Sequence, residues 1–112
     1  MLMILKSISA IATILTGLYA LLAPLKVRGF TGLDLPGGRG ITEVRAILGG
    51  LFIALGAAPL LFGSLDMYTM LGVAYLGIAV VRAVSMFLDQ SLVSSNFISL
   101  AVEIVFGVIL IL

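Results

Sequence analysis

Three residue types are missing from the sequence, and their absence removes several kinds of chemistry. The 112 residues include no cysteine, no histidine and no tryptophan. Without thiolate or imidazole groups, the chain cannot form a disulfide, a structural zinc site, a redox-active thiol or the usual axial haem ligation, and no histidine can act as a general base. Paired carboxylates for hydrolysis, a serine nucleophile elbow and metal-ligand spacing are missing as well. We therefore expect no catalytic residue, no metal ligand and no cofactor.

Charge is also scarce. Only 10% of the residues are charged and 62% are hydrophobic, whereas a soluble domain has about 25% charged residues. Each crossing of a membrane needs about 20 apolar residues, so four crossings would use about 80 residues of this chain. The composition predicts an all-α integral membrane protein with four transmembrane helices. The net charge of +1 offers no field for binding phosphates, so we expect no nucleic-acid partner.

The apolar runs place the helices within one membrane domain that covers residues 1–112. We predict helices at about residues 7–25, 42–62, 67–88 and 92–112, with a glycine-rich loop at 26–41. Thr42 is predicted to cap the second helix, with Glu43 in its first turn. Because the later connections are short, successive helices should be antiparallel neighbours, and we predict an up-down-up-down bundle.

Lysine and arginine in the connections predict the orientation. The first loop carries Lys26, Arg28 and Arg39, and Arg45 follows just inside the next helix, whereas the opposite face has Lys6 and the α-amino group. Cytoplasmic loops are the ones enriched in basic residues. We therefore expect loops 26–41 and 89–95 to face the cytoplasm and both termini to lie outside.

Four charged residues fall inside the predicted spans, namely Glu43, Arg45, Arg82 and Glu103. A charge at mid-membrane costs about 2.5–3.5 kcal/mol on insertion scales, and pairing inside a bundle is the usual way to meet that cost. All four enter from the same face, so we predict an intramembrane polar cluster centred on Arg82 and Glu103, with Glu43 and Arg45 near its mouth. The cluster either fixes helix register or binds a polar ligand.

Small residues recur at four-residue spacing in the first two spans. The second span has Ala46, Gly50, Ala54 and Ala58, and the first has Ser9, Thr13 and Gly17. Since helices in lipid associate through close backbone approach, such rows indicate packing surfaces. We favour packing between the first two helices over an interface with a second copy or a partner protein.

Several short stretches together resemble a known family. They are Gly29-Phe-Thr-Gly-Leu-Asp34, Glu43-Val-Arg45-Ala46 followed by Gly49-Gly50, Arg82 with Ser85 and Asp89, and Glu103. In these stretches, the chain resembles small bacterial four-helix membrane proteins that belong to a family of unknown function related to the DoxX-like proteins. The resemblance implies a four-helix bundle in a bacterial inner membrane, with Glu43, Arg45, Arg82 and Glu103 at marked positions. Some DoxX-like relatives are linked to quinone-coupled oxidation as membrane subunits.

Three functions remain open at this point. The first is a small structural or accessory subunit without catalysis, which packs in the bilayer against a larger membrane assembly or a second copy. The second is a membrane partner of an oxidoreductase that holds a quinone or a lipid head group at the Arg/Glu cluster. The third is a small transporter, because small multidrug transporters have a similar size and number of spans.

Overall fold

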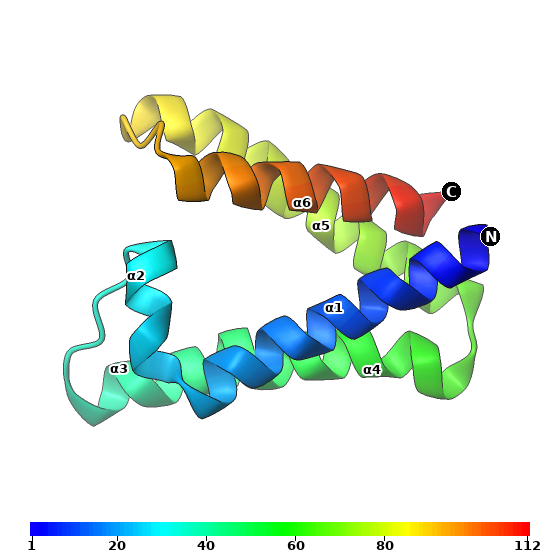
Figure 1. Cartoon of the computed structure of the whole chain (residues 1–112), viewed down its shortest axis with the longest axis horizontal. Coiled ribbons are helices and arrows are strands. Elements are labelled where there is room, and N and C mark those ends of the chain that lie inside the picture. The colour runs from blue at the N-terminus through cyan, green and yellow to red at the C-terminus, as the bar shows by residue number, and fades with distance from the viewer. The chain divides into compact units, whose positions relative to one another are not determined.

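The computed structural model describes residues 1–112, and all of its regular structure is helical. The predicted all-α class is therefore confirmed. In chain order (Figure 1) the elements are α1 (Leu2–Leu22), the 3-10 turn η1 (Pro24–Lys26), α2 (Val27–Thr31), α3 (Gly37–Val44), the π-helix η2 (Arg45–Leu51), α4 (Phe52–Phe62), α5 (Leu65–Leu88) and α6 (Ser94–Ile111).

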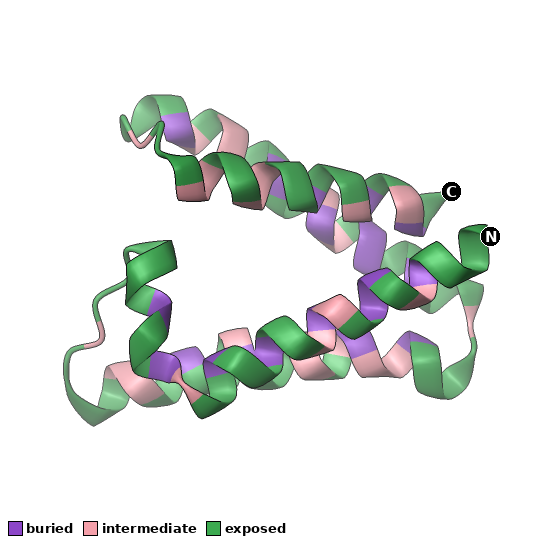
Figure 2. Cartoon of the chain, viewed as in Figure 1, coloured by how far each residue is buried: buried purple, intermediate pink, exposed green.

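Four stretches of helix have the length and apolar character needed to cross a bilayer. They are Leu2–Leu22, Gly37–Phe62, Leu65–Leu88 and Ser94–Ile111. Large apolar residues are exposed along all of them. In Figure 2, exposed positions are coloured green and occur on every one of these helices. A surface of this kind is suited to lipid rather than water. The helices thus indicate an integral membrane protein, and their arrangement as one up-down-up-down bundle stays a prediction.

The chain forms two compact units, of which the first contains residues 1–9 and 64–112. In this unit α5 and α6 form an antiparallel hairpin (Figure 1). The two helices approach closely at Gly72 and Gly107, where a Cβ added to Gly72 would lie 3.0 Å from the carbonyl oxygen of Gly107. The rings of Tyr75 and Phe106 meet edge to face nearby, with centroids 5.6 Å apart. Small residues therefore set the spacing of this hairpin.

The second unit contains residues 10–63, and in it α1 packs antiparallel against η2 and α4. A Cβ on Gly17 would lie 2.7 Å from the carbonyl oxygen of Gly49, and one on Gly56 would lie 2.5 Å from that of Ala10. Both distances are shorter than real Cβ contacts, so neither position has room for a side chain. The predicted packing between the first two membrane-spanning stretches is confirmed.

The structure places the two rows of small residues predicted for helix packing differently. Ser9, Thr13 and Gly17 are buried. In contrast, Ala46, Gly50 and Ala54 are exposed and Ala58 is only half-buried, while the buried positions of this span are Val44, Gly49, Gly56 and Pro59.

The π-helix η2 changes the spacing of the buried positions at the start of this span. A row at four-residue spacing assumes an α-helix, in which residues three or four apart share a face. In a π-helix the hydrogen bonds run between residues five apart, so the turn is wider. Val44 and Gly49 are five residues apart and both buried. At the π-helical turn, the buried positions are therefore spaced by five residues instead of four.

The predicted starts of the first and second membrane-spanning helices also need correction. The first helix begins at Leu2 rather than near residue 7, so Lys6 lies within it and is buried. The long aliphatic stem of a lysine can lie along apolar neighbours, which makes this position tolerable. Leu22 ends the helix just ahead of Pro24. Ala23, with φ −134° and ψ 59°, is not helical, because a residue before proline avoids the helical region.

The predicted loop 26–41 is largely helical. It contains η1, α2 and the start of α3, and only residues 32–36 between α2 and α3 lack regular structure. Gly32 ends α2 with a φ of +74°, a left-handed conformation that glycine adopts without steric cost. The next helix starts at Gly37, after Pro36, so Thr42 lies inside α3 and is not its N-cap. Proline fixes the backbone before the first turn and thereby favours this earlier start.

Candidate functional site

Arg82 of α5 and Glu103 of α6 form a bidentate ion pair. Arg82 Nε lies 2.8 Å from Oε1 of Glu103, and Nη2 lies 2.8 Å from Oε2. The side chain of Glu103 is 9% exposed and that of Arg82 is 30% exposed. Paired N–H donors on a carboxylate are a strong, directional arrangement, which keeps both charges satisfied within an apolar hairpin. The pair predicted at the centre of the polar cluster is thus present.

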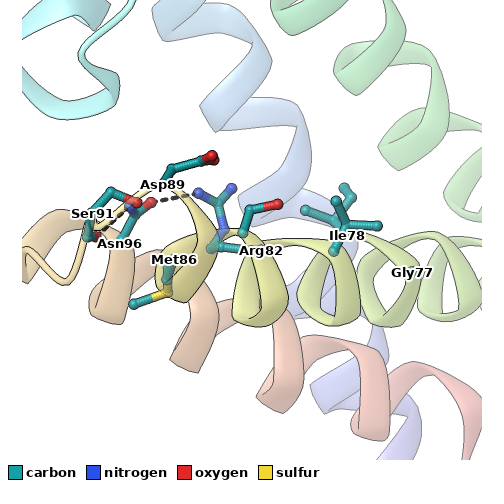
Figure 3. A pocket seen from close by; sticks show the side chains of 9 residues that line it. Gly77, Ile78, Arg82, Met86, Asp89, Ser91 and Asn96 are labelled. Atoms are coloured by element: carbon teal, nitrogen blue, oxygen red, sulfur yellow. Dashed lines mark hydrogen bonds between the residues drawn. The ribbon is translucent and has the colours of Figure 1, made fainter.

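Asn96 extends the network toward the connection between the two helices. Arg82 Nη1 donates to Oδ1 of Asn96 at 2.9 Å, and Asn96 Nδ2 donates to the carbonyl oxygen of Ser91 at 2.9 Å (Figure 3). The guanidinium therefore points along α5 toward the end of the hairpin, as expected for an arginine that reaches for the membrane surface. Asn96 is not among the predicted site residues, although its carboxamide within the predicted span 92–112 was an available signal.

An open pocket of about 590 Å³ lies beside this network. Its walls are formed by Gly77, Ile78, Val81, Arg82, Ser85, Met86, Asp89, Ser91 and Asn96. Figure 3 shows that Asp89, Ser91 and Asn96 lie on one side of Arg82 and Ile78 and Gly77 on the other. The pocket is thus polar toward the connection and apolar farther along α5. Its volume falls within the range of small-molecule sites, about 300–1,000 Å³.

Arg82 keeps hydrogen-bonding capacity beyond its protein partners. A guanidinium has five N–H groups. The Nε group donates to Glu103, one group on Nη2 does the same, and one on Nη1 donates to Asn96. One N–H on each terminal nitrogen therefore has no protein acceptor, and Arg82 is one of the pocket's walls. A ligand oxygen that reaches either of these N–H groups can accept a hydrogen bond from it while the ion pair to Glu103 stays intact.

The other two residues of the predicted cluster belong to the second unit and have partners there. Arg39 Nη1 donates to Oε2 of Glu43 at 3.0 Å, one helical turn away on α3. Arg45 Nε donates to the carbonyl oxygen of Leu21 at 3.2 Å. Both Glu43 and Arg45 are exposed. The predicted convergence of these residues with Arg82 and Glu103 stays a prediction.

A comparison with protein families classifies the chain. The model of a domain of unknown function, DUF4345, matches residues 1–112. The chain belongs to this family. The DUF4345 match covers both units, so the Arg82–Glu103 pair and the pocket lie inside the family domain. No curated protein and no solved structure matches the chain. The predicted membership in a family of unknown function is thereby confirmed. The link of this family to the DoxX-like proteins stays a prediction.

Proposed function

We propose that this protein binds the polar head of a lipid-soluble ligand, a lipid or a quinone, in the pocket beside Arg82 and Glu103, and has no catalysis of its own. The observation that carries the proposal is the open pocket of about 590 Å³ next to an arginine with two unused N–H donors. A phosphoryl or carbonyl oxygen is the acceptor that such a pair of donors fits.

The polarity of the pocket supports a ligand with an apolar tail. Gly77 and Asp89 are 12 residues apart on one helix, so the pocket follows α5 for about 18 Å. Its polar end lies at the hairpin connection and its apolar end deeper in the span. A lipid or a quinone has the same order of groups across a leaflet, with its oxygens near the surface and its hydrocarbon toward the midplane.

The proposal also includes a placement in the membrane. The protein lies in a bacterial inner membrane as a bundle of four spans, with residues 26–41 and 89–95 on the cytoplasmic side. The basic residues Lys26, Arg28, Arg39 and Arg45 support this side for the first connection. An even number of spans then leaves both termini outside, and the ligand head would be bound in the cytoplasmic leaflet.

A substitution that fills the pocket tests the function. An added Cβ at Gly77 has nothing within 4 Å, so Gly77→Leu projects into open space without moving the protein. The matched control is Val84→Leu, on the same helix, 54% exposed and outside the pocket. Each protein is purified in mild detergent, its bound lipids and quinones are extracted, and their amount per protein is measured by mass spectrometry.

We expect the unchanged protein and Val84→Leu to retain the same bound molecule, and Gly77→Leu to lose most of it. Equal retention in Gly77→Leu, at equal helical content, would rule out the pocket as the binding site. Loss in both variants would show that the effect is not specific to the pocket, and would count against the proposal as well.

A role as an accessory subunit is the second candidate, and a different surface favours it. Ala46, Gly50 and Ala54 are exposed on η2 and α4, where small residues allow close approach of another helix. A membrane-protein partner or a second copy would pack there. Purification in mild detergent should then yield an oligomer or a complex that Gly50→Leu weakens. A protein that runs alone would contradict this role. Transport, the third function, stays a prediction.

A further inference from the structure

The charges of the α5–α6 hairpin do not balance. Residues 65–112 contain one cation, Arg82, and three carboxylates, at Asp66, Asp89 and Glu103. Arg82 and Glu103 neutralise each other through their bidentate contact. Asp89 lines the same pocket, is exposed and has no ion pair. The pocket and its ion pair therefore carry a net charge of about −1, which disfavours an anionic ligand and favours one with a positive group.

The backbone at this end of the hairpin adds to the same preference. Asp89 is the C-cap of α5, where the helix dipole places partial negative charge. A cation bound near Asp89 is stabilised by both the carboxylate and the helix end. The arginine donors, in contrast, require an oxygen acceptor. A ligand that satisfies both ends of the polar region must have a positive group beside an oxygen-bearing group.

The walls also distinguish between kinds of ammonium. A quaternary ammonium has no N–H and is usually bound by aromatic faces, and none of the nine residues that form the pocket is aromatic. A primary ammonium has three N–H donors. Oxygen acceptors for it are present in the carboxylate of Asp89 and the hydroxyls of Ser85 and Ser91.

We propose that the head group bound here is a zwitterion with a primary ammonium, as in an aminophospholipid such as phosphatidylethanolamine. Its phosphate accepts the two unused N–H groups of Arg82, and its ammonium donates to Asp89. One acyl chain continues past Val81 and Ile78 along the apolar part of the pocket. This inference rests on the proposed function and specifies the class of ligand.

The test uses the whole protein in vesicles made of equal parts phosphatidylethanolamine, phosphatidylcholine and phosphatidylglycerol. After extraction in mild detergent, the retained lipids are counted by mass spectrometry and compared with the vesicle composition. Asp89→Asn removes the carboxylate at an exposed position. The matched control is Asp66→Asn, which removes an exposed carboxylate from the first turn of the same helix, away from the pocket.

We expect phosphatidylethanolamine to be enriched roughly fivefold over phosphatidylcholine, the factor that one exposed charge contact supplies. Asp89→Asn should abolish the enrichment and Asp66→Asn should keep it. A preference for phosphatidylglycerol, no preference, or an enrichment that survives Asp89→Asn overturns the inference. Gly77→Leu separates the two proposals. If the unchanged protein retains lipid without an amine preference and Gly77→Leu loses that lipid, only the inference fails. If Gly77→Leu retains the lipid, the proposed site fails too.

Discussion

At the scale of single residues, the guanidinium of Arg82 makes contacts of two kinds. It neutralises Glu103 across the hairpin and donates to Asn96 toward the connection. These contacts hold the planar group in one orientation, with its remaining donors available to a ligand. A lysine could not do the same, because its single ammonium lacks the fixed fork that engages a carboxylate and a carboxamide at once.

Removing the carboxylate should destabilise the hairpin. Glu103→Gln leaves the Arg82 charge without its anion, and we expect a loss of about 3 kcal/mol, the lower end for a broken buried pair because Arg82 is partly exposed. Arg82→Gln should cost a similar amount, and the double variant should recover part of either loss. Unfolding in mixed detergent micelles, followed by circular dichroism, gives the free energies.

Asp66→Asn is the control for this series, since Asp66 is an exposed carboxylate on α5. We expect it to change stability by no more than about 0.5 kcal/mol. Additive losses in the Arg82→Gln, Glu103→Gln double variant would contradict a direct energetic coupling between the two side chains.

At the scale of elements, two glycines of the second span set its packing face against α1. The glycines that allow close approach are Gly49 and Gly56, and Gly50, immediately next to the first of these, is exposed. The π-helix covers seven residues, Arg45–Leu51, and its hydrogen bonds run between residues five apart. Its first residue, Arg45, donates from Nε to the carbonyl oxygen of Leu21 near the end of α1.

A matched pair of glycine substitutions tests this packing face. Gly56→Ala places a methyl group 2.5 Å from the carbonyl oxygen of Ala10 and forces α1 away from α4. We expect a loss of about 1–3 kcal/mol from overpacking. Gly50→Ala meets only the oxygen of Arg45 at 3.8 Å, and should be neutral or stabilise by up to about 1 kcal/mol. Thermal unfolding in detergent compares the two, and an equal effect would contradict the assigned face.

At the scale of the whole molecule, charge is distributed unevenly between the two units. The stretch 26–45 carries four basic and two acidic residues, whereas 65–112 carries one basic and three acidic residues. Basic residues in a connection favour its retention in the cytoplasm. The predicted orientation depends on the basic residues of 26–45, whereas the proposed preference for a ligand with a positive group depends on the excess of carboxylates in 65–112.

Cysteine labelling tests the orientation, and the chain has no cysteine of its own to interfere. Single substitutions Leu33→Cys, Ser64→Cys and Leu92→Cys place a thiol in each of the three connections. In intact cells, a maleimide that cannot cross the membrane should label only Ser64→Cys, and permeabilised cells should show labelling at all three. Labelling of Leu33→Cys in intact cells would reverse the predicted sides.

The sequence by itself determined the fold class, the approximate positions of the four spans and the Arg82–Glu103 pair. Length, apolar runs and the cost of a lone charge in lipid depend on composition and spacing alone. Only the tertiary structure decided the packing face of the second span, the helical parts of residues 26–41, the place of Asn96 and the pocket. These depend on a π-helical turn, on close contacts between glycines and the opposite helix, and on where an arginine's side chain ends. Such features follow from the three-dimensional path of the chain, which periodicity does not specify.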